Sequence, residues 1–302
     1  MTIRSTEPFA LVNGSDIYYP ILMEKRILGR TDMNVSVVGF GGIPIQGLSF
    51  EESEKVILHA ADSGINFFDS ARGYTDSEEK IGRALRSRRH DIYLSTKAMS
   101  RDAASMRGEL ETSLKRLGTE MIDLYQMHAV GSTGQLERIL GPGGAYEVLA
   151  RAKEEGKVRW IGVTGHSKPV LLEAVASGRF DTVQFPFNPI EREWETELMP
   201  VAKAAGMGTI GMKPIAGGAI RHPALSIRYT LTRGMDVSIP GMDSIGQVDE
   251  NSAAGMSLEP LSDEEISLLE EERDFWGEKF CRRCGYCLPC PAGLNIPFLL
   301  LL

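Results

Sequence analysis

Residues 65–97 read INFFDSARGYTDSEEKIGRALRSRRHDIYLSTK and contain the pattern that decides the fold. Two short runs rich in apolar residues, Ile65–Asp69 and Ile92–Lys97, flank the amphipathic stretch Ser77–Arg88. The second run lacks strict apolar–polar alternation, as expected of a strand that is covered on both faces. A strand, a helix and a second strand in this order predict a βαβ unit, in which the two strands are parallel.

The same alternation continues on both sides of this unit. Further strands are expected at Val35–Phe40, Ile122–His128, Val158–Thr164, Thr182–Phe185, Thr209–Pro214 and Val237–Pro240. Further helices are expected at Glu51–Ser63, Ala103–Leu117, Ala145–Glu155, Pro169–Ser177, Glu195–Ala205, Pro223–Arg233 and Ile245–Ala254. Eight strand–helix units match the size of a (β/α)8 TIM barrel, an α/β fold.

The alternative fold is an open, doubly wound sheet. Its first strand is followed by the fingerprint G-x-G-x-x-G, and a helix starts immediately. The corresponding stretch here is GFGGIP (39–44), which lacks that spacing. We therefore expect the barrel.

Segments outside the eight units complete the expected domain organisation. Residues 24–36 (EKRILGRTDMNVS) contain a Gly-Arg-Thr-Asp turn and predict a hairpin before the first strand. Residues 262–265 (SDEE) have capping-box spacing and predict a helix that continues to about Trp276. We expect three parts, namely an N-terminal extension (1–23), the barrel (24–258) and a C-terminal helix with a small cysteine-rich tail (259–302).

Composition excludes several functional classes. The 302 residues include 33 Lys and Arg against 41 Asp and Glu, a net charge of −8, so a basic face for nucleic acid is not expected. No apolar run reaches the ~18 residues of a membrane span, and the start has no apolar core of a secretory signal. We expect a cytoplasmic protein with neither nucleic acid nor a membrane as its partner.

Ionisable residues close three consecutive predicted strands. Asp69 ends the second strand, Lys97 the third and His128 the fourth, while Tyr74 follows on the second loop. Each residue alone has a structural explanation, such as an ion pair or a hydrogen-bonded core histidine. Chemistry in this fold occurs at the C-terminal ends of the strands, and neighbouring strands are ~4.8 Å apart. The four side chains are therefore expected to converge on one site.

These four groups suit carbonyl reduction. A tyrosine holds its proton at neutral pH and can donate it to a carbonyl oxygen as hydride arrives at the carbon. The ammonium of Lys97 would bring the Tyr74 pKa closer to neutral, and Asp69 would keep Lys97 charged and oriented. His128 would hydrogen-bond the carbonyl and position it.

Three segments resemble the signatures of the aldo-keto reductase family, namely NFFDSARGYTDSEEKIGRAL (66–85), YLSTK (93–97) and DLYQMH (123–128). With RILGRTDMNVSVVGFGG (26–42) and IPGMDSIGQVDEN (239–251), the resemblance covers roughly residues 24–255. It implies a (β/α)8 barrel that binds NADP or NAD without a Rossmann domain, and a small carbonyl or alcohol substrate. It also implies a catalytic tetrad, which is Asp69, Tyr74, Lys97 and His128.

The resemblance implies cofactor contacts as well. Gly41 and Gly42 match the family's glycines after the first strand, and Gln184 in QFPFN (184–188) matches the glutamine that meets the nicotinamide carboxamide. Thr164 and Gly165 replace the family's usual Ser-Asn, which removes one carboxamide partner. The other implied contacts are Met212, Lys213, Pro214, Gly218, Gly241, Gln247, Glu250 and Asn251.

The adenine side departs from the family pattern. Gly241, Met242 and Gln247 stand where NADP-dependent relatives often have Lys, Ser and Arg. Without those cations a 2′-phosphate has no clamp, and Asp243 would oppose it. We expect a weak preference for NADP, or use of NAD.

The four cysteines of the chain form one run, C-x2-C-x2-C-x2-C-P, at Cys281, Cys284, Cys287 and Cys290. This run is close to the bacterial ferredoxin pattern C-x2-C-x2-C-x3-C-P and predicts a 4Fe–4S cluster. Zinc and free thiols are the alternatives. Residues 281–297 also resemble the tail of a subset of aldo-keto reductases with a C-terminal ferredoxin-like motif, which implies an accessory cluster. The cluster would either exchange electrons with a redox partner protein or fold the tail.

Two other functions stay open at this stage. A barrel-strand lysine such as Lys97 can form a Schiff base, as in an aldolase. A nicotinamide-binding module for sensing or electron transfer is the other alternative. Residues 129–144 (AVGSTGQLERILGPGG) are expected to form a surface loop, with a mobile lid as the alternative. The substrate and the oligomeric state cannot be predicted.

Overall fold

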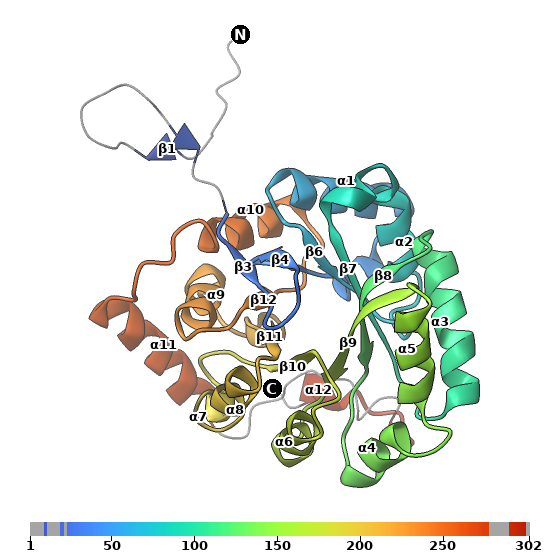
Figure 1. The fold of residues 1–302 in the computed structure, drawn as a ribbon. Helices are drawn as coiled ribbons and strands as arrows, with labels where there is room; N and C mark the ends of the chain where they lie inside the picture. Colours follow the sequence, from blue (N-terminus) through green and yellow to red (C-terminus); the bar gives the residue numbers. More distant parts are fainter. Residues whose placement is uncertain (1–8, 11–18, 21–22, 278–289, 300–302) are drawn as a thin grey trace.

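A computed structural model of the chain describes residues 9–10, 19–20, 23–277 and 290–299 (Figure 1). Its central feature is one sheet of eight parallel strands in sequential order, β5 to β12. Parallel bridges between Val38 and Ser238 and between Gly41 and Gly241 join the first and last strands. The predicted (β/α)8 barrel is therefore confirmed, in nearly closed form. The strands are β5 (Phe40–Gly41), β6 (Phe67–Asp69), β7 (Tyr93–Ala98), β8 (Ile122–Met127), β9 (Val158–Thr164), β10 (Thr182–Pro186), β11 (Gly208–Met212) and β12 (Val237–Ile239).

Helices surround the barrel, as Figure 1 shows. Their apolar faces contribute to the main hydrophobic core between helices and sheet, because parallel strands need cover on their outer face. The α-helices are α1 (Phe50–Asp62), α2 (Ser77–Ala84), α3 (Ala103–Leu117), α4 (Thr133–Leu140), α5 (Ala145–Glu154), α6 (Lys168–Ala176), α7 (Glu193–Thr196), α8 (Leu198–Ala204), α9 (Pro223–Thr232), α10 (Ile245–Ala254), α11 (Asp263–Trp276) and α12 (Ile296–Leu299). Short 3₁₀ helices occur at η1 (Pro44–Gly47), η2 (Arg86–Asp91) and η3 (Ala216–Gly218).

The predicted hairpin closes one end of the barrel. Strands β3 (Lys25–Ile27) and β4 (Asn34–Ser36) pair antiparallel, and a second short pair is β1 (Phe9–Ala10) with β2 (Tyr19–Pro20). Leu28 and Met33 of the hairpin are fully buried in a cluster with the barrel residues Phe67, Leu124, Ile210, Val237 and Ile239. The N-terminal end of the barrel is thereby filled with side chains, and its C-terminal end is the one available to a ligand.

Two predicted elements are divided differently in the structure. The run Val35–Phe40 was expected to be one strand, but Asn34–Ser36 pairs within the hairpin and the barrel strand starts at Phe40. The run Glu195–Ala205 was expected to be one helix, but the structure has α7 and α8. Pro200 explains this break, because it cannot donate a hydrogen bond to the turn before it.

The segment 129–144 is not a loop throughout, so that expectation is wrong. Residues Thr133–Leu140 form helix α4, whose first turn is capped by the Ser132 side chain on the Gln135 amide. Leu136 and Ile139 bury its apolar face in the main core. With only eight residues, α4 is too short for a clear helical period in the sequence.

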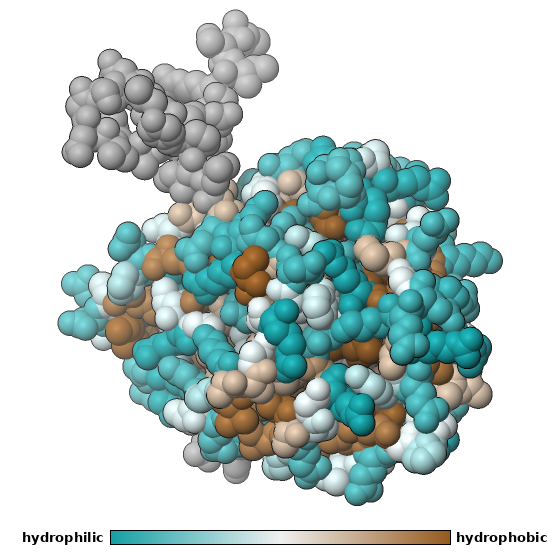
Figure 2. Space-filling view, in the orientation of Figure 1, coloured by the Kyte–Doolittle hydropathy of each residue, from teal (hydrophilic) through white to brown (hydrophobic). Residues whose placement is uncertain are grey.

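Helix α11 begins with the predicted capping box, in which Ser262 and Glu265 exchange side-chain and backbone hydrogen bonds. Its last residue, Trp276, packs against Ala216, Ala219 and Ile220 near the C-terminal end of β11. On the face in Figure 2, hydrophilic residues predominate and apolar residues gather in small groups. Within the described part of the chain, no helix has both the length and the apolar character to cross a bilayer.

Candidate active site

The structure brings Asp69, Tyr74, Lys97 and His128 together at the C-terminal ends of β6, β7 and β8. The Nζ atom of Lys97 lies 2.5 Å from Oδ2 of Asp69 and 2.6 Å from the carbonyl oxygen of Ser70. The same Nζ lies 5.0 Å from the ring centroid of Tyr74. The rings of Tyr74 and His128 meet edge to face, with centroids 5.9 Å apart. The convergence expected from the strand ends is what the barrel geometry produces.

The loop that carries Tyr74 is fixed by residues that the sequence analysis missed. The Arg72 amide donates to the carbonyl oxygen of Lys97 at 2.9 Å. The Arg72 guanidinium pairs with the buried Glu78 at 3.0 Å and with Glu109 at 2.7 Å. Thr96 donates to the other oxygen of Glu78. Glu78 lies in the first turn of α2, where an acidic residue is ordinary, so the sequence held no signal for this role.

Burial controls the pKa of Tyr74. Removal from water raises that pKa above 10.0, Lys97 lowers it and Asp69 raises it further. The net direction is upward, whereas the sequence analysis expected Lys97 to bring it closer to neutral. The reason is that a phenolate loses its hydration when buried, and one ammonium already paired with Asp69 does not compensate. Tyr74 is therefore protonated at neutral pH.

The two basic members of the group have opposite charge states. Burial alone would lower the pKa of Lys97, but Asp69 and Tyr74 outweigh it and leave that pKa above its usual value. Burial, together with the charges of Lys97, Arg101 and His166, lowers the pKa of His128 to about 3. Lys97 is thus an ammonium and His128 a neutral imidazole over the physiological range.

The second oxygen of Asp69 belongs to a buried polar network. Oδ1 accepts hydrogen bonds from Ser95 Oγ at 2.8 Å and from Gln126 Nε2 at 3.3 Å. Gln126 also donates to Gln184 Oε1 at 2.7 Å. The sequence analysis did not select Ser95 or Gln126. A signal was present, because each stands two residues before a selected residue, Lys97 or His128, and alternation places them on the same inward face.

A cavity of about 440 Å³ opens beside Tyr74 and Asp69. Its lining includes eight of the twelve predicted cofactor contacts, which are Gly41, Gly42, Gln184, Met212, Lys213, Gly218, Gly241 and Gln247. Ile43, Pro44, Ile215, Gly217, Ile239 and Asp243 complete the lining. The volume lies in the usual range for a small-molecule or cofactor site.

The wall formed by residues 213–218 has an unusual backbone. Lys213, Ala216, Gly217 and Gly218 all have positive φ angles, between 51° and 89°. Asn188 supports this wall by donating to the carbonyl oxygen of Lys213 at 3.1 Å. These turns close on themselves, because the Ala216 amide donates to the carbonyl oxygen of Lys213 and the Gly218 amide to that of Ile215, each at 2.9 Å.

Four predicted cofactor contacts lie outside the cavity lining. Thr164 is buried, and its Oγ1 accepts from the Ala129 amide at 2.9 Å. Pro214 is buried, and its carbonyl oxygen accepts from Ser226. Glu250 is exposed on α10, whereas the neighbouring Asn251 is buried.

The predicted metal ligands cannot be assembled from the structure. Cys281, Cys284 and Cys287 lie outside the described residues, and Cys290 is a half-buried free cysteine. Within the described ranges, no group of three or more His, Cys, Asp or Glu side chains is arranged to hold a metal ion.

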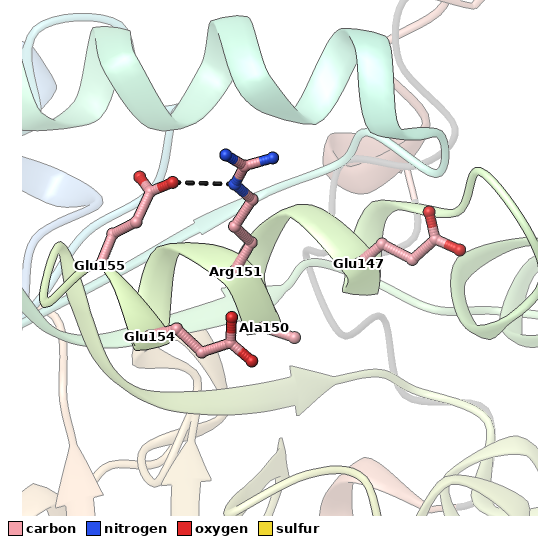
Figure 3. A pocket seen from close by; sticks show the side chains of 5 residues that line it. All are labelled: Glu147, Ala150, Arg151, Glu154 and Glu155. Atoms are coloured by element: carbon pink, nitrogen blue, oxygen red, sulfur yellow. Dashed lines mark hydrogen bonds and ion pairs between the residues drawn. The ribbon is translucent and has the colours of Figure 1, made fainter.

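A second depression lies over α5, and its lining contains none of the predicted site residues (Figure 3). It is lined by Glu147, Ala150, Arg151, Glu154 and Glu155, and Arg151 pairs with Glu155 at 2.9 Å. These charged side chains point outward from one helix, as on an ordinary solvated helix face. The depression holds no arrangement that suggests chemistry.

Comparisons with known proteins agree with this geometry. A model of the aldo/keto reductase family matches residues 37–224. L-galactose dehydrogenase of Arabidopsis thaliana is 28% identical over 83% of this chain and 93% of its own length. An aldo-keto reductase from Bacillus halodurans, solved in its holo form, has a TM-score of 0.71 and 25% identity over 83% of this chain and 96% of that chain. The fold is also that of an aldo-keto reductase from Klebsiella pneumoniae in complex with NADPH, with a TM-score of 0.69 and 23% identity over 83% of this chain and 95% of that chain.

Proposed function

The chain belongs to the aldo/keto reductase family and is an NAD(P)-dependent oxidoreductase, and we propose that it interconverts an aldehyde or ketone with its alcohol, with Tyr74 as the general acid/base. The observation that carries this proposal is the position of a buried, protonated Tyr74 next to the Lys97–Asp69 ion pair, on the wall of the cavity. Bound NAD(P)H supplies the hydride.

Each member of the group has one part in the reaction. Tyr74 donates its proton to the carbonyl oxygen as negative charge develops there. The ammonium of Lys97 stabilises the phenolate that Tyr74 becomes, and Asp69 keeps that ammonium oriented. His128 is neutral and offers an N–H donor that positions the carbonyl. Because burial favours the protonated phenol, Tyr74 is in the form that carbonyl reduction requires.

The cavity residues fit a nicotinamide dinucleotide. Gln184 offers an amide for the carboxamide, and Lys213 lines the same cavity as a cation for the diphosphate. Among the lining residues that the structure describes, Lys213 is the only Lys or Arg, while Asp243 and Gln247 lie on the adenine side of the family pattern. We therefore propose use of NAD or a weak preference for NADP, although the Klebsiella pneumoniae relative holds NADPH.

A panel of aldehydes and ketones tests the proposed function, with NADH or NADPH consumption as the readout. We expect turnover with both dinucleotides on at least one carbonyl class, and a preference for NADPH well below about a hundredfold. Tight dinucleotide binding without turnover of any carbonyl would contradict the proposal and favour a sensing or electron-transfer module.

The aldolase alternative is disfavoured by the state of Lys97. A Schiff base forms from a neutral amine, whereas Asp69 and Tyr74 hold the pKa of Lys97 above its ordinary value. The Lys97 ammonium also donates hydrogen bonds to Asp69 and to the carbonyl oxygen of Ser70, which hold it in its charged form. Borohydride trapping of a carbonyl substrate on Lys97 would contradict this interpretation.

We also propose that residues 259–302 form an accessory tail with a 4Fe–4S cluster. Four thiolates at Cys281, Cys284, Cys287 and Cys290 are a suitable donor set for one cubane, and their spacing supports the proposal. Such a cluster belongs to a reducing, cytoplasmic setting, where it could serve a redox partner protein or fold the tail. Anaerobic purification with iron and sulfide assays tests it, and a zinc-only product would overturn it.

A further inference from the structure

A chain of buried polar groups crosses the barrel interior from the catalytic site to the cofactor cavity. Nε2 of Gln126 lies 3.3 Å from Asp69 Oδ1, 3.1 Å from Ser95 Oγ and 2.7 Å from Gln184 Oε1. Gln126 and Gln184 have exposed fractions of 0% and 1%, so water does not compete for these contacts. Nε2 has two protons, so the short contact with Gln184 uses one and the longer contacts with Ser95 and Asp69 share the other. Gln184 is also part of the cavity lining, and this contact therefore links Asp69 to the place of the nicotinamide.

Gly162 makes this contact possible. Gln126 on β8 is paired with Gly162 on β9, which is paired with Thr182 on β10. A Cβ atom at position 162 would lie 2.9 Å from Gln126 Cγ and 2.3 Å from Thr182 Oγ1. Because β9 has no side chain there, Gln126 can reach across it to Gln184, two strands away.

The ion pair sets the direction of both amides. Asp69 is paired with Lys97, and an ionised carboxylate only accepts hydrogen bonds. Gln126 must therefore turn its NH₂ group, not its oxygen, toward Asp69. That same NH₂ group meets Gln184, so Gln184 turns its Oε1 inward. The remaining group of the Gln184 amide is Nε2, a donor, and it is left for the cavity.

We propose that Gln126 is a positioning residue, which fixes the Gln184 amide so that its Nε2 faces the nicotinamide carboxamide. The site then recognises the carboxamide oxygen as an acceptor, and the carboxamide NH₂ contributes little to recognition by Gln184. This inference rests on the proposed function, because it takes the cavity to be the nicotinamide site.

Two dinucleotide analogues distinguish the two orientations of the Gln184 amide. The acetylpyridine analogue replaces the carboxamide NH₂ by a methyl group and keeps the oxygen. The thionicotinamide analogue keeps the NH₂ and replaces the oxygen by sulfur, a weak acceptor. Isothermal titration calorimetry of each analogue and of the natural dinucleotide gives Kd without turnover. ADP-ribose, which lacks the nicotinamide, reports on the rest of the cavity.

For the wild-type protein we expect the acetylpyridine analogue to bind within about threefold of the natural dinucleotide, and the thionicotinamide analogue about fivefold more weakly. In Gln126→Met, which keeps the length but not the donor, the Gln184 amide can turn, and the ratio of the two analogue Kd values should approach one. ADP-ribose should bind equally to both proteins. Gln126→Leu repeats the test if the Met variant is poorly folded.

Ser95→Ala is the matched control. It removes another partner of Gln126 Nε2 from the same buried network but leaves the contact with Gln184, so the wild-type ratio should persist. The inference would be overturned if Gln126→Met had the same ratio of the two analogue Kd values as wild type. It would also be overturned if wild type bound the acetylpyridine analogue more weakly than the thionicotinamide analogue. Failure of wild type to bind the natural dinucleotides would instead overturn the proposed function, and the inference with it.

Discussion

Asp69 and Lys97 form an ion pair of 2.5 Å with side chains only 3% and 1% exposed, on neighbouring strands at the open end of the barrel. The two charges stay together because separating them would leave each charge buried without a partner. The ammonium lies 5.0 Å from the ring centroid of Tyr74, and Gln126 connects Asp69 to Gln184 in the cavity lining. One ion pair thus has contacts toward both the residue that we propose as the proton donor and the side of the cavity that we propose for the cofactor.

The burial of this pair predicts a large effect on stability. We expect Asp69→Asn to lower the free energy of unfolding by about 3–5 kcal/mol, because it leaves the Lys97 charge unpaired. Asp62→Asn is the control, since Asp62 and Arg88 also lie 2.5 Å apart but are 59% and 38% exposed. It should cost at most about 1 kcal/mol in the same urea titration. Equal effects of the two substitutions would contradict this account.

The raised pKa of Tyr74 predicts the pH dependence of reduction. The donor is lost as the pH rises through that pKa, which burial places above 10.0. We therefore expect kcat/KM for carbonyl reduction to stay flat between about pH 6 and about pH 9. Initial rates in buffers of constant ionic strength measure this. A decline centred between pH 7 and 8 would show that the proton donor has a lowered pKa.

His128 predicts a loss of stability in acid. Its pKa is about 3 in the folded protein and about 6.5 in the unfolded chain, so the unfolded chain binds an additional proton below pH 6.5. Its contribution to stability is complete above that pH and decreases by about 1.4 kcal/mol per unit as the pH falls. His128→Asn should remove this part of the dependence in urea titrations at pH 7, 6 and 5. Parallel curves for the two proteins would refute the assignment.

The crowding around Gly162 predicts a cost for any side chain there. Gly162→Ala places a Cβ atom 2.3 Å from Thr182 Oγ1, and we expect it to destabilise the protein by about 1–3 kcal/mol. Gly134 in α4 is the matched control, since nothing lies within 4 Å of a Cβ added there. Gly134→Ala should stabilise by up to about 1 kcal/mol through helix propensity. Thermal unfolding of the two variants measures both effects. An unchanged stability of Gly162→Ala would contradict the close approach of Thr182 and Gln126 to position 162.

The adenine side predicts a change in cofactor preference. Replacing Asp243 by Ser and Gln247 by Arg removes an opposing charge and supplies a bidentate partner for a phosphate. We expect the double variant to increase kcat/KM with NADPH relative to NADH by about tenfold or more. A ratio that does not change would mean that neither residue meets the 2′-position.

The fold and the convergence of four ionisable side chains at the strand ends were predictable because they depend on local patterns. The order of strands and helices determines a barrel, and a polar residue that ends each of three consecutive strands must lie at its open end. The division between α7 and α8 does not follow from apolar periodicity, because the break comes from the missing backbone N–H of Pro200. Helix α4 was missed because eight residues give too little periodicity.

The supporting contacts were less predictable, since they depend on register across the barrel. The contact between Gln126 and Gln184 requires two strand registers and the absence of a side chain at Gly162. The pairing of Arg72 with Glu78 and Glu109 joins a loop to two helices, and no spacing of residues in the sequence predicts it. The direction of the Tyr74 pKa shift likewise required the depth of burial, which the sequence does not give.

The central claim, that Tyr74 delivers the proton while the cofactor delivers hydride, is tested most directly by Tyr74→Phe with NAD(P)H deuterated at the nicotinamide C4. Wild type should transfer deuterium to the carbonyl carbon of a substrate identified in the panel. Tyr74→Phe should bind the dinucleotide with an unchanged Kd but reduce that substrate about 10²–10⁴-fold more slowly in a single turnover. Wild-type rates in Tyr74→Phe, or an alcohol product without deuterium, would contradict the account.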